Sequence, residues 1–300
     1  MMGEESGPRS SKEKKTLFPG AKIGLKSLRN DKLKPASKYY DYETTLSFGI
    51  ATTIFLLIPY IHFDIIYSLW SEYTRPVNKT TCTCNCWDST FKSNYEAGTP
   101  RYKHVYFNIT SNSLKMWAVT ILAILLFYET IRKTCHLMSE RRLRRSMLVL
   151  FVASIYPHYY SWWSFFNFWN DEYQHQWSHQ LLFSITECVS TYFVVHLLDL
   201  KESTTPWKLM VVLSVATAHC LTSLRDQFGY NVIRGEGELH QVLRDVGFML
   251  PDLLCVYVAL REMKVYARRN YVPVSYLVSN ATFGCSFGFV LLMFISSTFL

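Results

Sequence analysis

The stretch LSFGIATTIFLLIPYIHFDIIYSL, residues 46–69, decides the class of fold. Its 24 residues carry one acidic side chain, Asp64, and no Lys or Arg. Coiled as an α-helix, a segment of this length is about 36 Å long and crosses ~30 Å of hydrocarbon. Residues 1–44, by contrast, are polar and hold ten Lys and Arg. The stretch therefore predicts a membrane-spanning helix that follows a basic tail and acts as its own signal anchor.

Six further apolar segments follow, at 114–131, 146–166, 179–199, 207–224, 243–260 and 274–298. Together they predict an all-α fold, a polytopic bundle of about seven transmembrane helices over residues 45–300, after a disordered cytosolic tail at 1–44. The third segment is the least regular, because it becomes aromatic and polar beyond Pro157, a residue that kinks or ends a helix. Six or eight spans are the alternatives if that half lies in the interface.

The distribution of Lys and Arg predicts the orientation. The tail, residues 132–145, residues 200–208 and residues 261–270 hold 22 of the 31 basic residues, and all four would lie on one side of seven spans. Basic loops stay in the cytosol. We therefore expect a cytosolic N-terminus and an extracellular C-terminus, the reverse of a G-protein-coupled receptor.

The loop at 70–113 would then face the outside, and its sequence agrees with that side. It holds two N-glycosylation sequons, at Asn78 and Asn108, and the run Cys82-Thr-Cys84-Asn-Cys86. Three thiols cannot all pair with one another, so one needs a distant partner such as Cys220. A disulfide-stapled, glycosylated cap is the main interpretation; a zinc site and intermolecular disulfides are the alternatives.

The net charge of +8 does not indicate nucleic-acid binding, because the charge lies in the tail and in loops that set orientation. The run Arg141-Arg142-Leu-Arg144-Arg145 borders the third segment. It could contact anionic lipid headgroups or a partner protein, or serve as an orientation signal alone.

Ionisable residues inside apolar segments indicate function, because a charge in lipid costs several kcal/mol. Of Asp64, Glu129, Glu187, His196, His219 and Asp252, two lie deep within their segments. These are Glu187 and Asp252, and the latter follows Pro251, which removes a backbone donor. Both are candidates to line an ion path; the alternative is a carboxyl paired across the bundle or kept protonated.

A possible metal site lies between the third and fourth segments. His175 and His179 are four residues apart, and Asp171 is nearby. With Ser154 and His158, these residues resemble elements of the seven-span membrane hydrolases related to progestin/adipoQ receptors and alkaline ceramidases, which hold zinc. In those families the elements are spread over distant helices, whereas here they fall within 26 residues. We expect an interfacial polar patch, with no metal or other cofactor.

Two other patterns predict packing. Arg225-Asp226 and Arg244-Asp245 end the fifth segment and begin the sixth, and we expect reciprocal ion pairs between them. Gly284 and Gly288 form a G-x-x-x-G pattern in the last segment, for which we expect close helix packing within the bundle.

Several short strings resemble the invertebrate Fuseless family. They are Cys82-x-Cys-x-Cys-Trp-Asp-x-x-Phe-Lys92, Tyr102-Lys-His-x-Tyr-Phe-Asn108, His240-Gln-Val-Leu-Arg-Asp245 and Leu250-Pro-Asp-Leu-Leu254. The resemblance implies a multi-span membrane protein that helps to organise presynaptic calcium channels. Fuseless-like proteins usually have eight spans and seven are counted here, so no functional residue is carried over.

The leading hypothesis is therefore a non-enzymatic, multi-pass protein of the plasma membrane, reached through the secretory pathway, and of the synapse if the resemblance extends to function. It would organise other membrane proteins, such as a channel complex, and contact membrane lipid; oligomeric state cannot be read from the sequence. An ion channel or transporter with Glu187 and Asp252 along its path is the first alternative. A zinc-dependent intramembrane hydrolase is the second.

Overall fold

The computed structural model describes residues 36–69, 111–170 and 177–299, and the regular secondary structure in these ranges is helical. The isolated antiparallel bridge between Leu143 and Asp199 adds no strand. The elements in chain order are α2 (Ala36–Leu69), α4 (Ser111–Ser139), α5 (Arg145–Asn170), α6 (Trp177–His196), α7 (Pro206–Arg225), η5 (Gly229–Ile233), α8 (Leu239–Arg269), η6 (Val274–Tyr276) and α9 (Asn280–Phe299).

Each predicted apolar segment coincides with a helix, with different ends. The largest difference is at α2, which begins at Ala36, inside the segment predicted as disordered tail. Residues 36–45 contain no Gly or Pro, so a helix nucleated by the apolar stretch extends through them at little cost. The last segment also differs, because the short 3₁₀-helix η6 and a bend precede α9.

Four helices of the described ranges are long and apolar enough to cross a membrane: α2 over Tyr42–Ile65, α4 over Leu114–Ser139, α7 and α9. This identifies a helical membrane protein. Helices α5, α6 and α8 fall short, because the first two are rich in polar and aromatic residues and α8 is charged at both ends. The count of seven spans therefore stays a prediction beyond these four.

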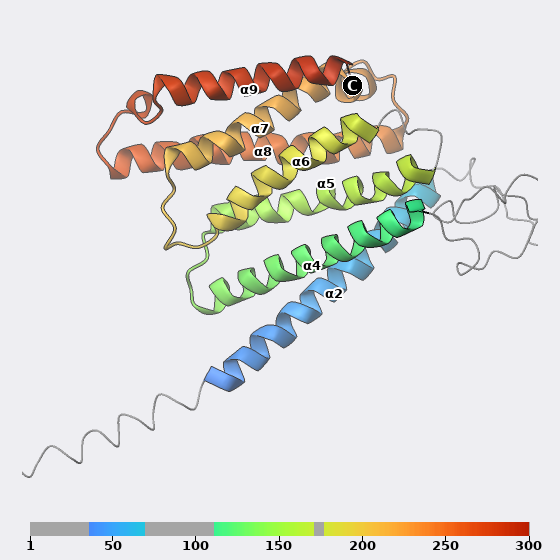
Figure 1. Cartoon of the computed structure of the whole chain (residues 1–300), viewed down its shortest axis with the longest axis horizontal. Coiled ribbons are helices and arrows are strands. Elements are labelled where there is room, and N and C mark those ends of the chain that lie inside the picture. Colours follow the sequence, from blue (N-terminus) through green and yellow to red (C-terminus); the bar gives the residue numbers. More distant parts are fainter. Residues whose placement is uncertain (1–35, 70–110, 171–176, 300) are drawn as a thin grey trace, which may run out of the picture. The chain divides into compact units, whose positions relative to one another are not determined.

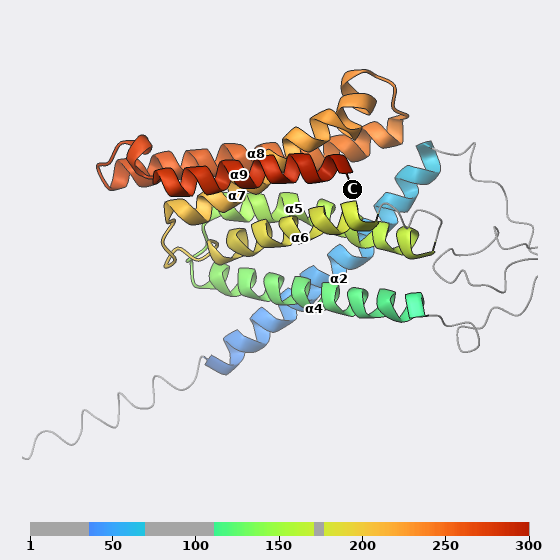
Figure 2. The same ribbon diagram turned by 45° about the horizontal axis from the view of Figure 1, so that its top comes forward.

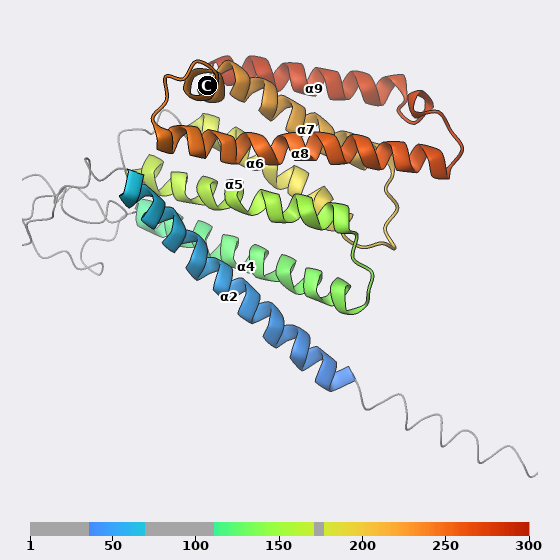
Figure 3. The same ribbon diagram turned by 180° about the vertical axis from the view of Figure 1, so that it is seen from behind.

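The chain divides between Thr45 and Leu46 into two compact units. The packing described below belongs to the second unit, Leu46–Leu300. Within that unit α7 contacts α6, α8 and α9, while α5 contacts α4, α6 and α8 (Figure 1). Figure 1 shows α9 along the top of this group, Figure 2 shows α9 in front of α8, and Figure 3 shows α8 beside α5 from behind. Ser214, Ala216 and Ala218 are buried in α7. Such small side chains let neighbouring helices approach closely.

The aromatic half of α5 joins it to two other helices. The Tyr159 hydroxyl lies 2.9 Å from His62 Nδ1 of α2, and Trp162 Nε1 donates to Thr120 Oγ1 of α4 at 3.0 Å. Pro157 lies inside α5 and does not end it. Trp and Tyr at helix interfaces bury their rings while their polar atoms find partners. The aromatic stretch is therefore a packing surface in this bundle.

The α4–α5 and α6–α7 loops meet at one end of the unit, on the left in Figure 1. Arg144 donates from Nη1 to the Leu197 carbonyl at 2.6 Å and from Nη2 to the Glu202 carbonyl at 2.8 Å. Arg142 forms an ion pair with Asp199. These two loops were both predicted to lie on the cytosolic side, and the structure places them together.

The apolar core lies beside these loops. Met147, Leu150, Leu197, Leu209 and Val212 are each at most 1% exposed and belong to one cluster of buried side chains. The cluster also draws on α2, α4, α6 and α8, and fills the bundle next to the loop end. Polar side chains concentrate farther from this end.

Candidate functional site

Three ionisable side chains from three helices converge inside the bundle. They are Glu187 of α6, His219 of α7 and Asp252 of α8, and one ligand atom from each lies within 4.8 Å of the others. His219 Nδ1 is 3.7 Å from Glu187 Oε2 and 3.6 Å from Asp252 Oδ1. The structure thus brings together the two carboxylates proposed as ion-path candidates and adds a histidine between them.

The packing of α7 between α6 and α8 explains this convergence. His219 is 6% exposed and faces both neighbours. The ring of Phe183 packs on it with 4.9 Å between centroids, and Thr186 Oγ1 lies 2.8 Å from its Nε2. On α8, Pro251 leaves the Gly247 carbonyl without its usual helical partner beside Asp252. The imidazole is therefore held firmly, next to a locally loosened helix.

The basic group of this cluster is the His219 imidazole, and no Lys or Arg in the described part of the chain joins it. The side chains of both carboxylates are mostly buried, at 16% and 15% exposed. Buried charges in proteins are normally paired or coordinate a metal. The Glu187–His219–Asp252 cluster is thus able to hold a cation.

Asp245, two turns before Asp252 on α8, has the opposite environment. Its carboxylate accepts from Asn231 Nδ2 at 2.6 Å and from Arg244 Nε at 2.7 Å, so it is satisfied. The expected reciprocal ion pairs are absent among the bonds of these helices. Arg225 instead donates to the Phe294 carbonyl of α9 at 3.3 Å, because α9 packs against that face of α7.

Of the three metal candidates between the third and fourth segments, His179 is described, and it does not belong to the Glu187–His219–Asp252 cluster. Asp171 and His175 lie outside the described residues. His179 is near the start of α6, where its ring packs on Phe183 with 4.7 Å between centroids. Two residues of the hydrolase-like pattern have other partners: Ser154 Oγ donates to the Phe151 carbonyl, and His158 Nε2 bonds Thr191 Oγ1.

The predicted outer cap lies outside the described residues, including Asn78, Asn108 and the Cys82, Cys84 and Cys86 run. Its suggested partner, Cys220, is a buried free thiol of α7, next to His219 in sequence. The glycosylated, disulfide-stapled cap therefore stays a prediction.

The basic run divides into two pairs. Arg142 and Arg144 are half-buried and bind the α6–α7 loop, whereas Arg141 and Arg145 are exposed. Burial tends to raise the pKa of Asp199, but the backbone N–H of Lys201 and the Arg142 guanidinium outweigh it and lower that pKa. Only Arg141 and Arg145 of this run thus present their side chains fully for contact with lipid or a partner.

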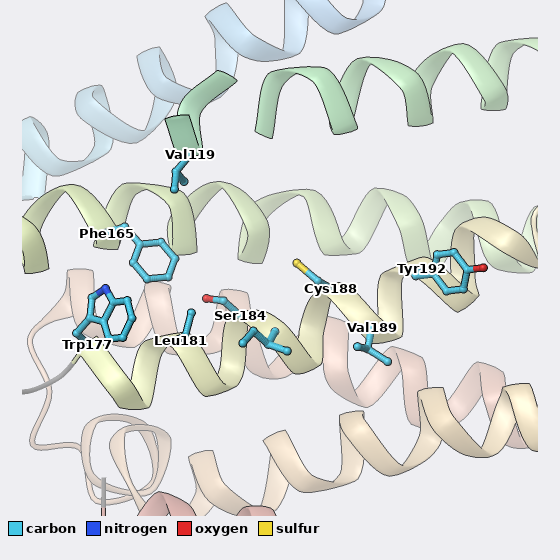
Figure 4. Close-up of a pocket in the computed structure, with 9 residues that line it drawn as sticks. Val119, Phe165, Trp177, Leu181, Ser184, Cys188, Val189 and Tyr192 are labelled. Atoms are coloured by element: carbon cyan, nitrogen blue, oxygen red, sulfur yellow. The ribbon is translucent and has the colours of Figure 1, made fainter. Parts of the chain in front are cut away.

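A pocket of about 570 Å³ lies away from the cluster, between α4, α5 and α6. Figure 4 shows Phe165 of α5 facing Trp177 and Leu181 of α6, with Val119 of α4 above them. Cys188 and Ser184 also line it. Its walls are nearly all apolar, so it offers space for a hydrocarbon chain and no acid–base chemistry.

Sequence reasoning singled out Glu187 and Asp252 but did not connect His219 to them. The available signal was that all three lie well inside their apolar segments, where an ionisable group needs a partner. The missing information was the rotation of each helix about its axis. That rotation decides which side chains face one another.

No curated protein and no solved structure matches the chain. A family model does match, and it covers residues 44–300, which include every helix from the predicted first span onward. The chain belongs to a family of unknown function designated DUF8801.

Proposed function

We propose that the protein is a multi-pass membrane protein that conducts or transports a cation, and that the cation passes the Glu187–His219–Asp252 cluster. The observation that carries this proposal is the convergence of two carboxylates and an imidazole from three helices, with no Lys or Arg among the described residues paired with either carboxylate. Intramembrane ionisable residues that face a bundle interior mark ion pathways and proton relays.

The proposal includes the predicted threading, with seven spans, a cytosolic N-terminus and a position in the plasma membrane. The support for the extra spans is that α5, α6 and α8 pack among the four apolar helices. Helices shielded by others need fewer apolar side chains than helices that face lipid.

The surroundings of the cluster differ along the bundle. Toward the η5 end, Thr222 lies one turn from His219, and its buried hydroxyl has no hydrogen-bond partner among the described residues. Asp245 and Asn231 lie farther along the same direction. Toward the loop end, the apolar core closes the bundle. A cation would thus reach the cluster from the η5 end, and its passage onward would require the core to open.

The test is flux in liposomes that contain the purified, full-length protein. Internal dyes would report protons and divalent cations separately, with wild type compared with Glu187→Gln and Asp252→Asn. We expect each variant to reduce cation flux at least tenfold. Glu129→Gln is the matched control, because Glu129 is an exposed carboxylate paired with Arg132 on α4, and it should leave flux unchanged.

Wild-type protein that carries no cation in either direction would refute the proposal. Equal flux in the control and in both cluster variants would do the same. The organising role for other membrane proteins and the hydrolase role stay predictions from the sequence.

A further inference from the structure

The Nδ1 atom of His219 lies between two carboxylates, within ion-pair range of both. Its distances of 3.7 Å to Glu187 Oε2 and 3.6 Å to Asp252 Oδ1 exceed those of N–H···O hydrogen bonds, which are about 2.7–3.2 Å. The imidazole is nevertheless buried. A buried imidazole nitrogen that faces carboxylates from two neighbouring helices is an arrangement that can hold a cation.

Thr186 determines which nitrogen of His219 holds the proton. Its single hydroxyl hydrogen is directed at the carbonyls of Leu182 and Phe183, each 3.0 Å from Oγ1. Carbonyls only accept, so the Thr186 oxygen is left to accept from Nε2–H of His219 at 2.8 Å. In the metal-bound state the imidazole would then present the lone pair of Nδ1 toward Glu187 and Asp252. A hydrogen bond at the far nitrogen is how proteins fix the tautomer of a metal-binding histidine.

The separations of His219 Nδ1 from the two carboxylate oxygens fit a particular class of cation, and the separation between the carboxylate oxygens is at most 4.8 Å. With metal–ligand bonds of about 2.0–2.2 Å and tetrahedral angles, two ligand atoms lie about 3.4 Å apart. Octahedral Mg²⁺, with bonds of about 2.0–2.1 Å, brings neighbouring ligands to about 2.9 Å. The 3.6 Å and 3.7 Å separations are close to the tetrahedral value. Calcium is disfavoured because it takes six to eight oxygen ligands and no imidazole.

We propose that Glu187, His219 and Asp252 bind one divalent first-row transition-metal ion, with Zn²⁺ as the best fit, through Nδ1 and one oxygen of each carboxylate. This inference names the cation class for the cluster used in the proposed function and rests on the same residues. Two carboxylates and a neutral imidazole carry a charge of −2, which a dication balances. Three protein ligands leave a fourth position open for water or an incoming ligand, as in exchangeable zinc sites.

Thr186 has a positioning role in this site. It touches the imidazole but offers no atom to the metal, because its hydroxyl lies at the opposite nitrogen. Loss of such an outer partner typically lowers metal affinity about 10–100-fold. The Thr186→Val variant keeps the shape of the side chain and removes the acceptor, so it isolates this role.

The experiment is equilibrium metal binding by the full-length protein in detergent, after removal of bound metal with a chelator. Titration with Zn²⁺ is followed by calorimetry, and titration with Co²⁺ by visible absorption, which reports tetrahedral coordination. We expect one metal ion per chain, loss of binding in His219→Ala, and at least a tenfold weaker affinity in Glu187→Gln and Asp252→Asn. Thr186→Val should weaken binding about 10–100-fold, and Glu129→Gln should not change it.

A folded wild-type protein that binds neither ion overturns the inference, and so does binding that survives Asp252→Asn and Thr186→Val unchanged. These two variants keep the test valid if His219→Ala fails to fold. Binding without flux in liposomes refutes the proposed transport but not the metal site. Proton flux that depends on the cluster without any metal binding refutes the metal site alone.

Discussion

Neutralising Asp252 should stabilise the metal-free protein, whereas the same change at Asp245 on the same helix should destabilise it. Asp252 and Glu187 present oxygens within 4.8 Å of each other beside His219, whose imidazole must be neutral if it is to bind a metal ion. At an effective dielectric constant of about 20, two unit charges at that distance repel by roughly 3.5 kcal/mol. In the wild-type protein one carboxyl can take up a proton, which relieves part of this repulsion. We therefore expect Asp252→Asn to raise the free energy of unfolding by less than the full repulsion, about 1–3 kcal/mol.

Asp245 is the matched control because its charge is satisfied. Asp245→Asn leaves Arg244 without its counter-charge and disturbs the hydrogen bond from Asn231. Breaking a buried pair in this way costs about 3–5 kcal/mol. Because Arg244 keeps some access to water, we expect a loss near the lower end, about 3 kcal/mol.

The assay is thermal unfolding in one detergent with a chelator present, followed by a dye that reacts with the buried thiols Cys135 and Cys220 as they become exposed. Each kcal/mol corresponds to about 2–4 °C in a chain of this size. Excess Zn²⁺ should narrow or reverse the gap between wild type and Asp252→Asn. Zinc at about 100 times the wild-type Kd adds about 2.7 kcal/mol to wild type and at most about 1.4 kcal/mol to a variant with tenfold weaker affinity. A chelated Asp252→Asn protein that melts well below wild type would refute this reasoning, because it would mean that His219 is charged and balances the carboxylates.

Three further predictions test other parts of the structure. The lowered pKa of Asp199 means that its ion pair stabilises the fold fully above the ordinary aspartate pKa of 3.8, and that this stabilisation is lost as pH falls through the lower folded-state pKa. The melting-temperature gap between wild type and Asp199→Asn should therefore close below about pH 3.8. A gap that is independent of pH would contradict this. Gly247→Ala should lower the free energy of unfolding by about 1–2 kcal/mol, because the new Cβ would lie 2.6 Å from a tyrosine ring of α5. Gly284→Ala has open space around the new Cβ and should raise the free energy of unfolding by up to about 1 kcal/mol. Similar melting temperatures for the two variants would argue against the α5–α8 packing. Glycosidase treatment of the protein from secretory cells should shift its mass, and removal of both sequons of the 70–113 loop should abolish that shift; an unglycosylated wild type would contradict the predicted threading.

The apolar segments allowed the helices to be predicted, because a lipid-crossing helix must be about 20 residues long and mostly apolar. The ends were harder. At α2 the helix extends into polar residues from Ala36, since nothing in that sequence stops it. The G-x-x-x-G pattern of α9 was expected to pack within the bundle, yet Gly284 and Gly288 have no atom within 4 Å of an added Cβ. Spacing along a helix does not say which way that face turns.

The candidate site was half predictable for a related reason. The cost of a charge in lipid marks Glu187 and Asp252 from sequence alone. Their meeting at His219 depends on the position of α7 between α6 and α8, which hydropathy does not report. The basic run shows the converse. Charge alone left lipid contact, partner contact and an orientation signal open for all four arginines, but Arg142 and Arg144 are directed to the α6–α7 loop once α5 and α6 pack together.

X-ray absorption spectroscopy of the zinc-loaded, full-length protein tests the central claim most directly, because it reports the atoms bound to the metal. The Glu187–His219–Asp252 site predicts nitrogen and oxygen donors only, at about 2.0–2.2 Å, with the scattering pattern of a single imidazole. That pattern should be lost in His219→Ala. Sulfur donors at about 2.3 Å would place the metal on cysteines instead and contradict the account, as would a purified, folded protein that retains no zinc.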